Sequence, residues 1–317
     1  MATIHRLIDE HGKAHAQEHV SGRRPHRAIQ AASAIMLDEM AGEVSNFIYS
    51  GWCHAGLPHR KPKDDTTKWN IETGYITLVV EPGSTLKAGG GYHHVGIPFG
   101  ATCRLILIYL QTRALETGDR HVELGKTLND FLTRLGLSQG GNTNRIVREQ
   151  IERISHCKLT FHLNKDGVRG IANQSIVETA IFFGDEAERK DRRQGSLFTD
   201  TLKLSEGFYN QLQRHAVRLD ESAIRRIHKS SRALDVYCFL AFRLHHLTAP
   251  TPISWAALRP QFGSEIKTRH HFKTQFLEDL ALAIAVYPEA NVDVNDKGIV
   301  LHPSPPPVAQ RRPRLAK

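Results

Sequence analysis

The stretch from Lys267 to Gln275 combines positive charge with hydrogen-bonding groups and contains no carboxylate. Phe272, Phe276 and Leu280 recur at the spacing of one helix face, which predicts a helix that buries that face and exposes the rest. Cations at the leading end of such a helix can neutralise phosphates, while neighbouring side chains reach base edges in the major groove of duplex DNA. The residues expected to contact DNA here are Lys267, Thr268, Arg269, His270, Lys273 and Thr274. The alternative is a basic surface helix without a ligand.

A second candidate helix lies near residues 142–154, with Ile146, Val147 and Ile151 on its inner stripe. Its outward positions are expected to be Asn142, Asn144, Arg145, Arg148, Glu149, Glu152 and Arg153. Of these, the DNA-contact candidates are Asn144, Arg145 and Arg148. However, Arg145 and Arg148 each have a glutamate four positions on, so they could instead form ion pairs on a solvated face. The sequence leaves both interpretations open.

Two four-residue turns of the same composition, Asn164–Gly167 and Asn295–Gly298, lie 131 positions apart. Apolar residues alternate before each turn, as in the strands of a hairpin. After the first turn, Ile176–Phe183 is the expected return strand. Cations of such hairpins can contact phosphates, and the candidates are Lys165, Arg169 and Lys297.

The elements that precede the two turns follow the same order of helix, short strand, helix and helix. In the first array they are expected at residues 104–117, 121–124, 128–135 and 142–154. In the second they are expected at residues 231–247, 251–254, 255–262 and from about 268 onward. With a terminal hairpin this is the order of a winged-helix domain, and its recurrence predicts an internal duplication.

The N-terminal part predicts a helix over 25–43 and a strand near 75–80, while the charged stretch 184–195 is typical of a solvated loop. We therefore expect an α+β fold made of two tandem winged-helix domains with a helical and β N-terminal extension. The expected bounds are 1–95 for the extension, 96–200 for the first winged-helix domain, 201–308 for the second and 309–317 for a basic tail.

The composition is typical of a soluble globular protein, and its positive charge favours a polyanionic partner without identifying it. The 317 residues carry 42 Lys and Arg against 33 Asp and Glu, a formal charge of +9. The longest apolar run, Leu105–Leu110, is far shorter than the roughly 20 residues of a membrane span. The charged N-terminus does not resemble a signal peptide. These features predict a cytoplasmic protein without a membrane partner.

No residue set predicts a cofactor or a metal site. The four cysteines lack Cys-x-x-Cys spacing and are expected to be reduced thiols. His11, His15 and His19 would share a helix face and could hold a divalent metal. Because no carboxylate or cysteine completes that ligand set, a solvated helix is favoured.

Catalytic motifs of DNA-processing enzymes are absent from the sequence. There is no Gly-x-x-x-x-Gly-Lys-Ser/Thr loop, no His-x-His pair for a nicking relaxase and no compact carboxylate cluster for a two-metal nuclease or primase. We expect no catalytic residues and a DNA-binding protein without enzymatic activity. A catalytic replication protein, either a nicking relaxase or a primase, and a winged-helix transcriptional repressor remain the alternatives.

Several segments resemble the plasmid-encoded RepA replication initiators of Gram-negative bacteria. The similarity extends over about residues 25–308, and the segments that carry it are Gly56–Arg60, Trp69, Ile97–Gly100, 104–125, 131–161 and 230–247. The resemblance implies an initiator that binds repeated sequences at the plasmid origin, helps open the duplex and recruits the host replicative helicase with the chromosomal initiator.

The resemblance also assigns roles to the two winged-helix domains. In related initiators the C-terminal domain makes the main contacts to the repeats, and the N-terminal domain adds DNA contacts or mediates dimerisation. This implies that the helix around Arg269 to Gln275 is the principal reader and that the helix at Asn144–Arg153 is secondary. A homodimer is compatible with the same resemblance.

Overall fold

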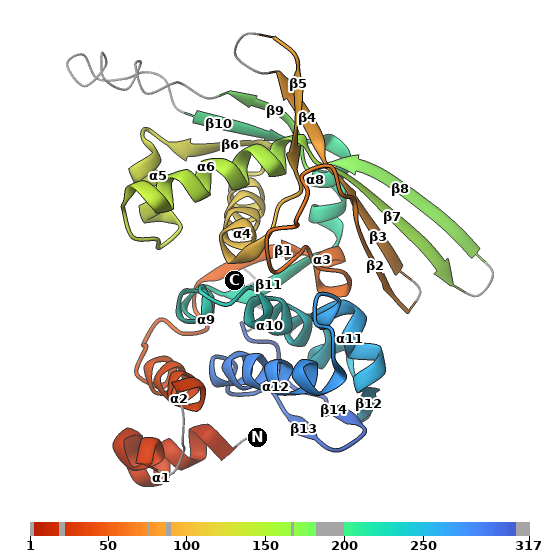
Figure 1. The fold of residues 1–317 in the computed structure, drawn as a ribbon. Helices are drawn as coiled ribbons and strands as arrows, with labels where there is room; N and C mark the ends of the chain where they lie inside the picture. Colours follow the sequence, from red (N-terminus) through yellow and green to blue (C-terminus); the bar gives the residue numbers. More distant parts are fainter. Residues whose placement is uncertain are drawn as a thin grey trace, which may run out of the picture. The chain divides into compact units, whose positions relative to one another are not determined.

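The computed structural model describes residues 3–18, 23–74, 76–86, 90–165, 168–181 and 200–308. Helices and several small antiparallel sheets alternate along the chain (Figure 1), as expected for an α+β fold. The expected loop 184–195, the basic tail 309–317 and the side chain of Lys165 lie outside the described residues.

The chain divides into two compact units, one made of residues 1–54 with 217–317 and the other of residues 55–216. This division differs from the bounds expected from the sequence. The segment 1–95 is shared between the two units, and the change of unit falls after Ala216 rather than after residue 200.

The discontinuous unit begins with two helices and a short strand and continues after residue 216. Its helices are α1 (Thr3–Glu18), α2 (Arg23–Met36), α3 (Gly51–His54), α9 (Glu221–Ile227), α10 (Ser231–Arg243), the 3-10 helix η1 (Leu244–His246), α11 (Trp255–Gly263) and α12 (Arg269–Ala285). Its strands are β1 (Ser45–Tyr49), β11 (Ala216–Asp220), β12 (Thr251–Ser254), β13 (Val292–Val294) and β14 (Gly298–Leu301).

The helix expected over 25–43 is shorter than predicted, because α2 ends at Met36. Asp38 then accepts a hydrogen bond from the backbone N–H of Met40 at 3.1 Å and pairs with Arg226 at 2.7 Å. Gly42 follows in the left-handed region at φ 77°. These interactions favour turns over a continued helix.

Helices α10, α11 and α12 surround the core of this unit, and Figure 1 shows α12 beside α10. The inner stripe of α12 is buried as predicted, at Phe272, Phe276, Leu280 and Ile284. The strands close one end as a three-stranded sheet in the order β12-β14-β13. The second array therefore has the predicted elements in the predicted order.

The continuous unit contains the first array together with strands from residues 69–96. Its helices are α4 (Gly100–Thr117), α5 (Leu128–Arg134), α6 (Gly141–His156) and α8 (Glu206–Arg214). Its strands are β2 (Trp69–Thr73), β3 (Ile76–Glu81), β4 (Gly83–Leu86), β5 (Tyr92–Gly96), β6 (His121–Gly125), β7 (Lys158–Lys165), β8 (Val168–Ser175), β9 (Val177–Ile181) and β10 (Asp200–Leu204). The strand expected near 75–80 is β3.

The hairpin of the first array pairs differently from the prediction. The return strand of β7 is β8, at Val168–Ser175, and the expected return strand near Ile176–Phe183 is instead β9, which pairs with β10. On its other side β7 pairs with β3, where Leu159 and Phe161 lie opposite Val80 and Leu78 and all four side chains are buried.

The two arrays consequently differ in their sheets. In the first, β6 pairs with β10, and the β7–β8 hairpin belongs to a four-stranded sheet in the order β2-β3-β7-β8. In the second, β12 pairs directly with β14 of its own hairpin. The order of elements is repeated along the chain, but the strand pairing is not.

The four cysteines are buried and free, as expected for reduced thiols. Burial raises the pKa of the Cys53 and Cys157 thiols, which makes both poor nucleophiles. Within the described part of the chain, no three His, Cys, Asp or Glu side chains are grouped as a metal-ligand set. No helix among those residues combines the length and apolar character needed to cross a membrane.

Candidate nucleic-acid interface

The leading end of α12 carries the exposed polar residues predicted from the sequence. Thr268 is its N-cap, and its hydroxyl accepts a hydrogen bond from the backbone N–H of His271 at 3.3 Å. Lys267, Arg269 and His270 are exposed, and the first turn contains no acid. Thr274 is also exposed and donates its hydroxyl to the carbonyl of His270 at 3.2 Å. Positive charge therefore lies at the surface where the helix begins.

The turn before α12 is fixed by an arginine on α11. One terminal nitrogen of Arg259 donates to the carbonyls of Ile266 and Lys267 at 3.0 and 2.9 Å. At Gly263, a Cβ would lie 2.1 Å from the Phe272 ring, so glycine allows α11 and α12 to approach closely. These contacts hold Lys267 and the beginning of α12 in one orientation.

Behind the exposed surface, α12 is anchored to α10 by an ion pair between Arg232 and Asp279. Their closest atoms lie 3.0 Å apart, and Arg232 also donates to the carbonyl of Phe262 at 2.7 Å. Burial raises the pKa of the Asp279 carboxyl, although hydrogen bonds from Ser230 and Arg232 act in the opposite direction. Gln275 accepts a hydrogen bond from Arg232 at 3.3 Å, so it contributes to this anchor.

Lys273 is half-buried and faces the hairpin turn of the same array. Its Nζ lies 3.8 Å from Oδ1 of Asp296 and 5.2 Å from the centre of the Trp255 ring. Lys297, on the same turn, is exposed. The sequence predicts a helix start without acids, but the fold brings Asp296 beside Lys273, which was not predicted. The available signal was the presence of Asp296 in the predicted turn.

The candidates on α6 have different surroundings. Arg145 is exposed and donates to Asn142 at 3.2 Å, with Glu149 at 3.9 Å. Arg148 is exposed. Asn144 is half-buried, and its Oδ1 is buried without a hydrogen-bond partner among the described residues. The start of α6 therefore presents two surface arginines and an amide directed partly inward.

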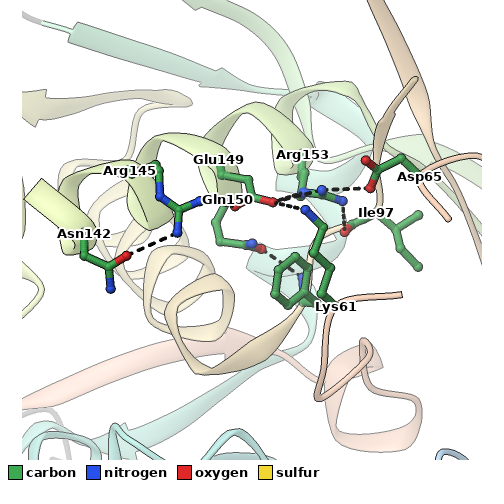
Figure 2. A network of polar contacts seen from close by, with 9 residues as sticks. Lys61, Asp65, Ile97, Asn142, Arg145, Glu149, Gln150 and Arg153 are labelled. Carbon is green, nitrogen blue, oxygen red and sulfur yellow. Dashed lines mark hydrogen bonds and ion pairs between the residues drawn. The ribbon is translucent and has the colours of Figure 1, made fainter. Parts of the chain in front are cut away.

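Arg153 was expected on the outer face of α6, but its side chain is only 3% exposed. It donates to Asp65 at 2.8 Å, to Glu149 at 2.9 Å and to the carbonyl of Ile97 at 3.1 Å (Figure 2). Its guanidinium also lies 5.2 Å from the centre of the Phe99 ring. The expectation was wrong because residues 65 and 97–99 cover this part of the helix.

Glu149 is part of the same network. Lys61 donates at 3.0 Å to the same carboxylate oxygen that accepts from Arg153 (Figure 2). Partial burial alone would raise the pKa of Glu149, but Lys61 and Arg153 outweigh burial and lower it. The charges of Lys61 and Arg153 thus favour the ionised form of this carboxylate. This side of α6 packs against other segments of the unit.

Segments that resemble the replication initiators meet around buried polar side chains. Arg104 on α4 donates to the carbonyls of Leu57 at 2.6 Å and Pro58 at 3.0 Å. Gln150 on α6 accepts a hydrogen bond from the backbone N–H of Phe99 at 2.9 Å. Trp69 donates its indole N–H to the carbonyl of Gly56 at 3.0 Å. These residues hold the loops near 57 and 99 against α4 and α6.

A pocket of about 380 Å³ lies beside α6 in the continuous unit. Its apolar lining consists of Leu124, Leu128, Phe131 and Ile151, and its polar lining consists of Thr85, Thr127, Arg148, Glu152, His156 and Asp200. Arg148 therefore shares this pocket with the two carboxylates of Glu152 and Asp200, which makes the surface around it less favourable for phosphate than the start of α12.

The remaining phosphate-contact candidates lie on two different sheets. Arg169 is exposed on β8, opposite Asn164 of β7 in the four-stranded sheet. Lys165 ends β7, with its backbone opposite Val168. Lys297 precedes β14, and its carbonyl accepts a hydrogen bond from the backbone N–H of Trp255 at 3.1 Å.

Two solved structures containing domains 2 and 3 of RctB are similar to this chain. One has 15% sequence identity and a TM-score of 0.47, and covers 73% of this chain and 83% of its own. The other has 13% identity and a TM-score of 0.46, and covers 80% and 94%. Both scores are below 0.5, and neither assigns the fold.

Among curated proteins, no sequence is significantly similar to the chain. Residues 97–256 match the sequence family described as plasmid encoded RepA protein. This match covers half of the chain and includes α4, the contacts between α4 and α6, and α10. The chain belongs to the plasmid-encoded RepA protein family.

Proposed function

We propose that this protein initiates plasmid replication by binding repeated duplex sequences at the plasmid origin. The observation that carries the proposal is the exposed, acid-free start of α12, held in place by Thr268, Arg259 and Arg232. A fixed helix end whose first turn carries cations and no acid suits a groove flanked by phosphates. The proposed contacts are those of Lys267, Thr268, Arg269, His270, Lys273 and Thr274.

The array around α6, the first of the two expected winged-helix domains, is proposed to add weaker contacts through Asn144, Arg145 and Arg148. Lys165, Arg169 and Lys297 are proposed to contact phosphates. The order of elements in both arrays supports two winged-helix domains, although the sheets are paired differently. Arg145 on α6 faces Glu149 at 3.9 Å and Lys273 on α12 faces Asp296 at 3.8 Å, so both helices carry one weakly paired cation. The first turn of α12 has no acid beside Arg269, and this favours α12 as the principal reader.

Binding alone does not start replication, so the proposal includes partners. Membership of the RepA family supports duplex opening and recruitment of the host replicative helicase and the chromosomal initiator, without catalysis by this chain. A homodimer is a further proposed state. A transcriptional repressor would bind DNA in the same way, and a minimal plasmid that replicates only when this protein is supplied distinguishes an initiator from a repressor.

The proposal is tested by footprinting the purified protein on the DNA that flanks its own gene. Protection of repeated sequences, lost in Arg269→Ala and kept in Arg148→Ala, is the expected result. In parallel, the protein is incubated with supercoiled origin plasmid and Mg²⁺ or Mn²⁺. A nicked product or a covalent protein–DNA adduct would instead support a catalytic replication protein.

A further inference from the structure

The turn between β13 and β14 places a carboxylate beside the basic half of α12. Oδ1 of Asp296 lies 3.8 Å from Nζ of Lys273, while the Asp296 side chain is fully exposed. Lys273 is therefore flanked by this carboxylate and by the ring of Trp255. A phosphate that approaches Lys273 also approaches Asp296, and the two negative charges repel each other.

The backbone around Asp296 is fixed by several hydrogen bonds. The side-chain oxygen of Asn295 accepts from the backbone N–H groups of Lys297 at 2.9 Å and Gly298 at 3.0 Å. The indole N–H of Trp255 donates to the carbonyl of Asp296 at 3.0 Å. Trp255 itself is buried against Phe276 of α12. The backbone at Asp296 is therefore held by the first residue of α11, which packs against α12.

The hairpin of β13 and β14 contains more acidic than basic residues, although a hairpin that binds phosphates is expected to be basic. Besides Asp296 it contains Asp293, whose carboxylate lies 2.8 Å from His302. Against these two acids stands one lysine, Lys297. Asp293 pairs with His302, the residue directly after β14, whereas Asp296 pairs with Lys273 of the proposed reader helix. Of the two carboxylates, Asp296 is the one paired with the DNA-binding surface.

On the basis of the proposed function of α12, we propose that Asp296 determines DNA specificity by opposing non-specific attachment to phosphates. Repulsion from the backbone applies to a duplex of any sequence, because every duplex has the same phosphates. Contacts of base edges with the start of α12 form only at a matching sequence and can offset that repulsion. A carboxylate can itself accept a hydrogen bond from a cytosine amino group, which no phosphate provides.

The test compares Asp296→Asn with Asp293→Asn, which removes the other acid of the same hairpin and is the matched control. The DNA probes are a duplex selected by the wild-type protein from a random library and a scrambled duplex of the same composition. Dissociation constants are measured by fluorescence anisotropy at several salt concentrations, with circular dichroism to verify folding. Arg269→Ala is included to test the reader helix independently.

We expect Asp296→Asn to bind the scrambled duplex about two- to fivefold more tightly, the size of one exposed charge interaction. Its log–log salt slope on that duplex should become steeper by about 0.9, since Lys273 gains a phosphate. Binding to the selected duplex should change less, so the ratio between the two affinities should fall, and Asp293→Asn should leave it unchanged.

Equal tightening on both duplexes, or no change on the scrambled one, would overturn the role of Asp296 while leaving α12 as the reader. If Arg269→Ala leaves binding to the selected duplex unaltered, the proposed function of α12 fails first, and the role of Asp296 fails with it.

Discussion

Replacing Arg153 with methionine should destabilise the unit of residues 55–216. The Arg153 side chain is 3% exposed, and its loss leaves Asp65, Glu149 and the Ile97 carbonyl without their common donor. Breaking a buried ion pair by removing one partner costs about 3–5 kcal/mol. Glu149 keeps Lys61 at 3.0 Å, and Asp65 is 42% exposed and can be hydrated. We therefore expect the lower end, about 3 kcal/mol.

Hydrogen exchange followed by mass spectrometry measures this loss locally, in peptides from α6 and from β3. A decrease of about 3 kcal/mol in opening free energy corresponds to exchange more than a hundredfold faster. Arg145→Met, on the exposed side of the same helix, is the matched control and should exchange like the wild type. If Arg153→Met lowers the opening free energy by less than about 1 kcal/mol, Arg153 is not the anchor described here.

The other predictions concern the anchor of α12, the hairpin, acid stability and salt. Arg232→Ala should lower the free energy of unfolding by about 3–5 kcal/mol near neutral pH in urea titrations, because it leaves Asp279 buried without its cation. Gly298→Ala should also destabilise its unit in urea titrations, since a Cβ would lie 1.9 Å from the Ile253 carbonyl oxygen. The lowered pKa of Glu149 stabilises the fold at pH values above the unfolded-state pKa of about 4.3. This stabilisation is lost as the pH falls through the lower pKa of the folded state. Glu149→Gln should therefore weaken the pH dependence of stability in acid-unfolding curves. Binding of the selected duplex should weaken with salt with a log–log slope of about −3 or steeper, if Lys267, Arg269 and Lys297 each neutralise a phosphate. A slope near zero in anisotropy titrations would contradict these contacts.

Local periodicity was sufficient to predict most helices and the buried face of α12. Phe272, Phe276 and Leu280 follow the helical repeat and are buried. The helix expected at 104–117 ends at Thr117, where Gly118 follows with a left-handed φ of 67°. These features depend on neighbours within a few residues, which a single sequence displays directly. The shortened α2 depends on Arg226, almost two hundred positions away from Asp38, and its end was not predictable in that way.

Strand pairing in the first array could not be predicted for the same physical reason. Alternating apolar residues in β7 match any strand with a buried face, so the pattern does not distinguish β3 from β6 as a partner. The structure pairs β7 with β3 and completes the sheet of β6 with β10. Only contacts between distant segments decide between these arrangements.

In the candidate site, the exposure of the cations at the start of α12 was predictable from the sequence. The contacts of Arg153 with Asp65 and of Lys273 with Asp296 were not. Arg153 follows the buried stripe of α6 closely, as does Gln150, three positions earlier, and both side chains are buried. That flanking position was a usable signal, although their partners Asp65 and Phe99 lie far away in the sequence. Asp296 is held near Lys273 by Trp255 of α11, which binds the Asp296 carbonyl and packs against Phe276 of α12.

The central claim is that α12, rather than α6, reads the DNA. The most direct measurement is the dissociation constant of folded Arg269→Ala and Arg148→Ala on the duplex selected by the wild-type protein. We predict that Arg269→Ala weakens binding by about 1–3 kcal/mol and relaxes specificity, with a smaller loss for Lys273→Ala because Asp296 already shares that charge. Arg148→Ala should weaken binding less than either variant. The reverse ranking would contradict the account and place the reader on α6.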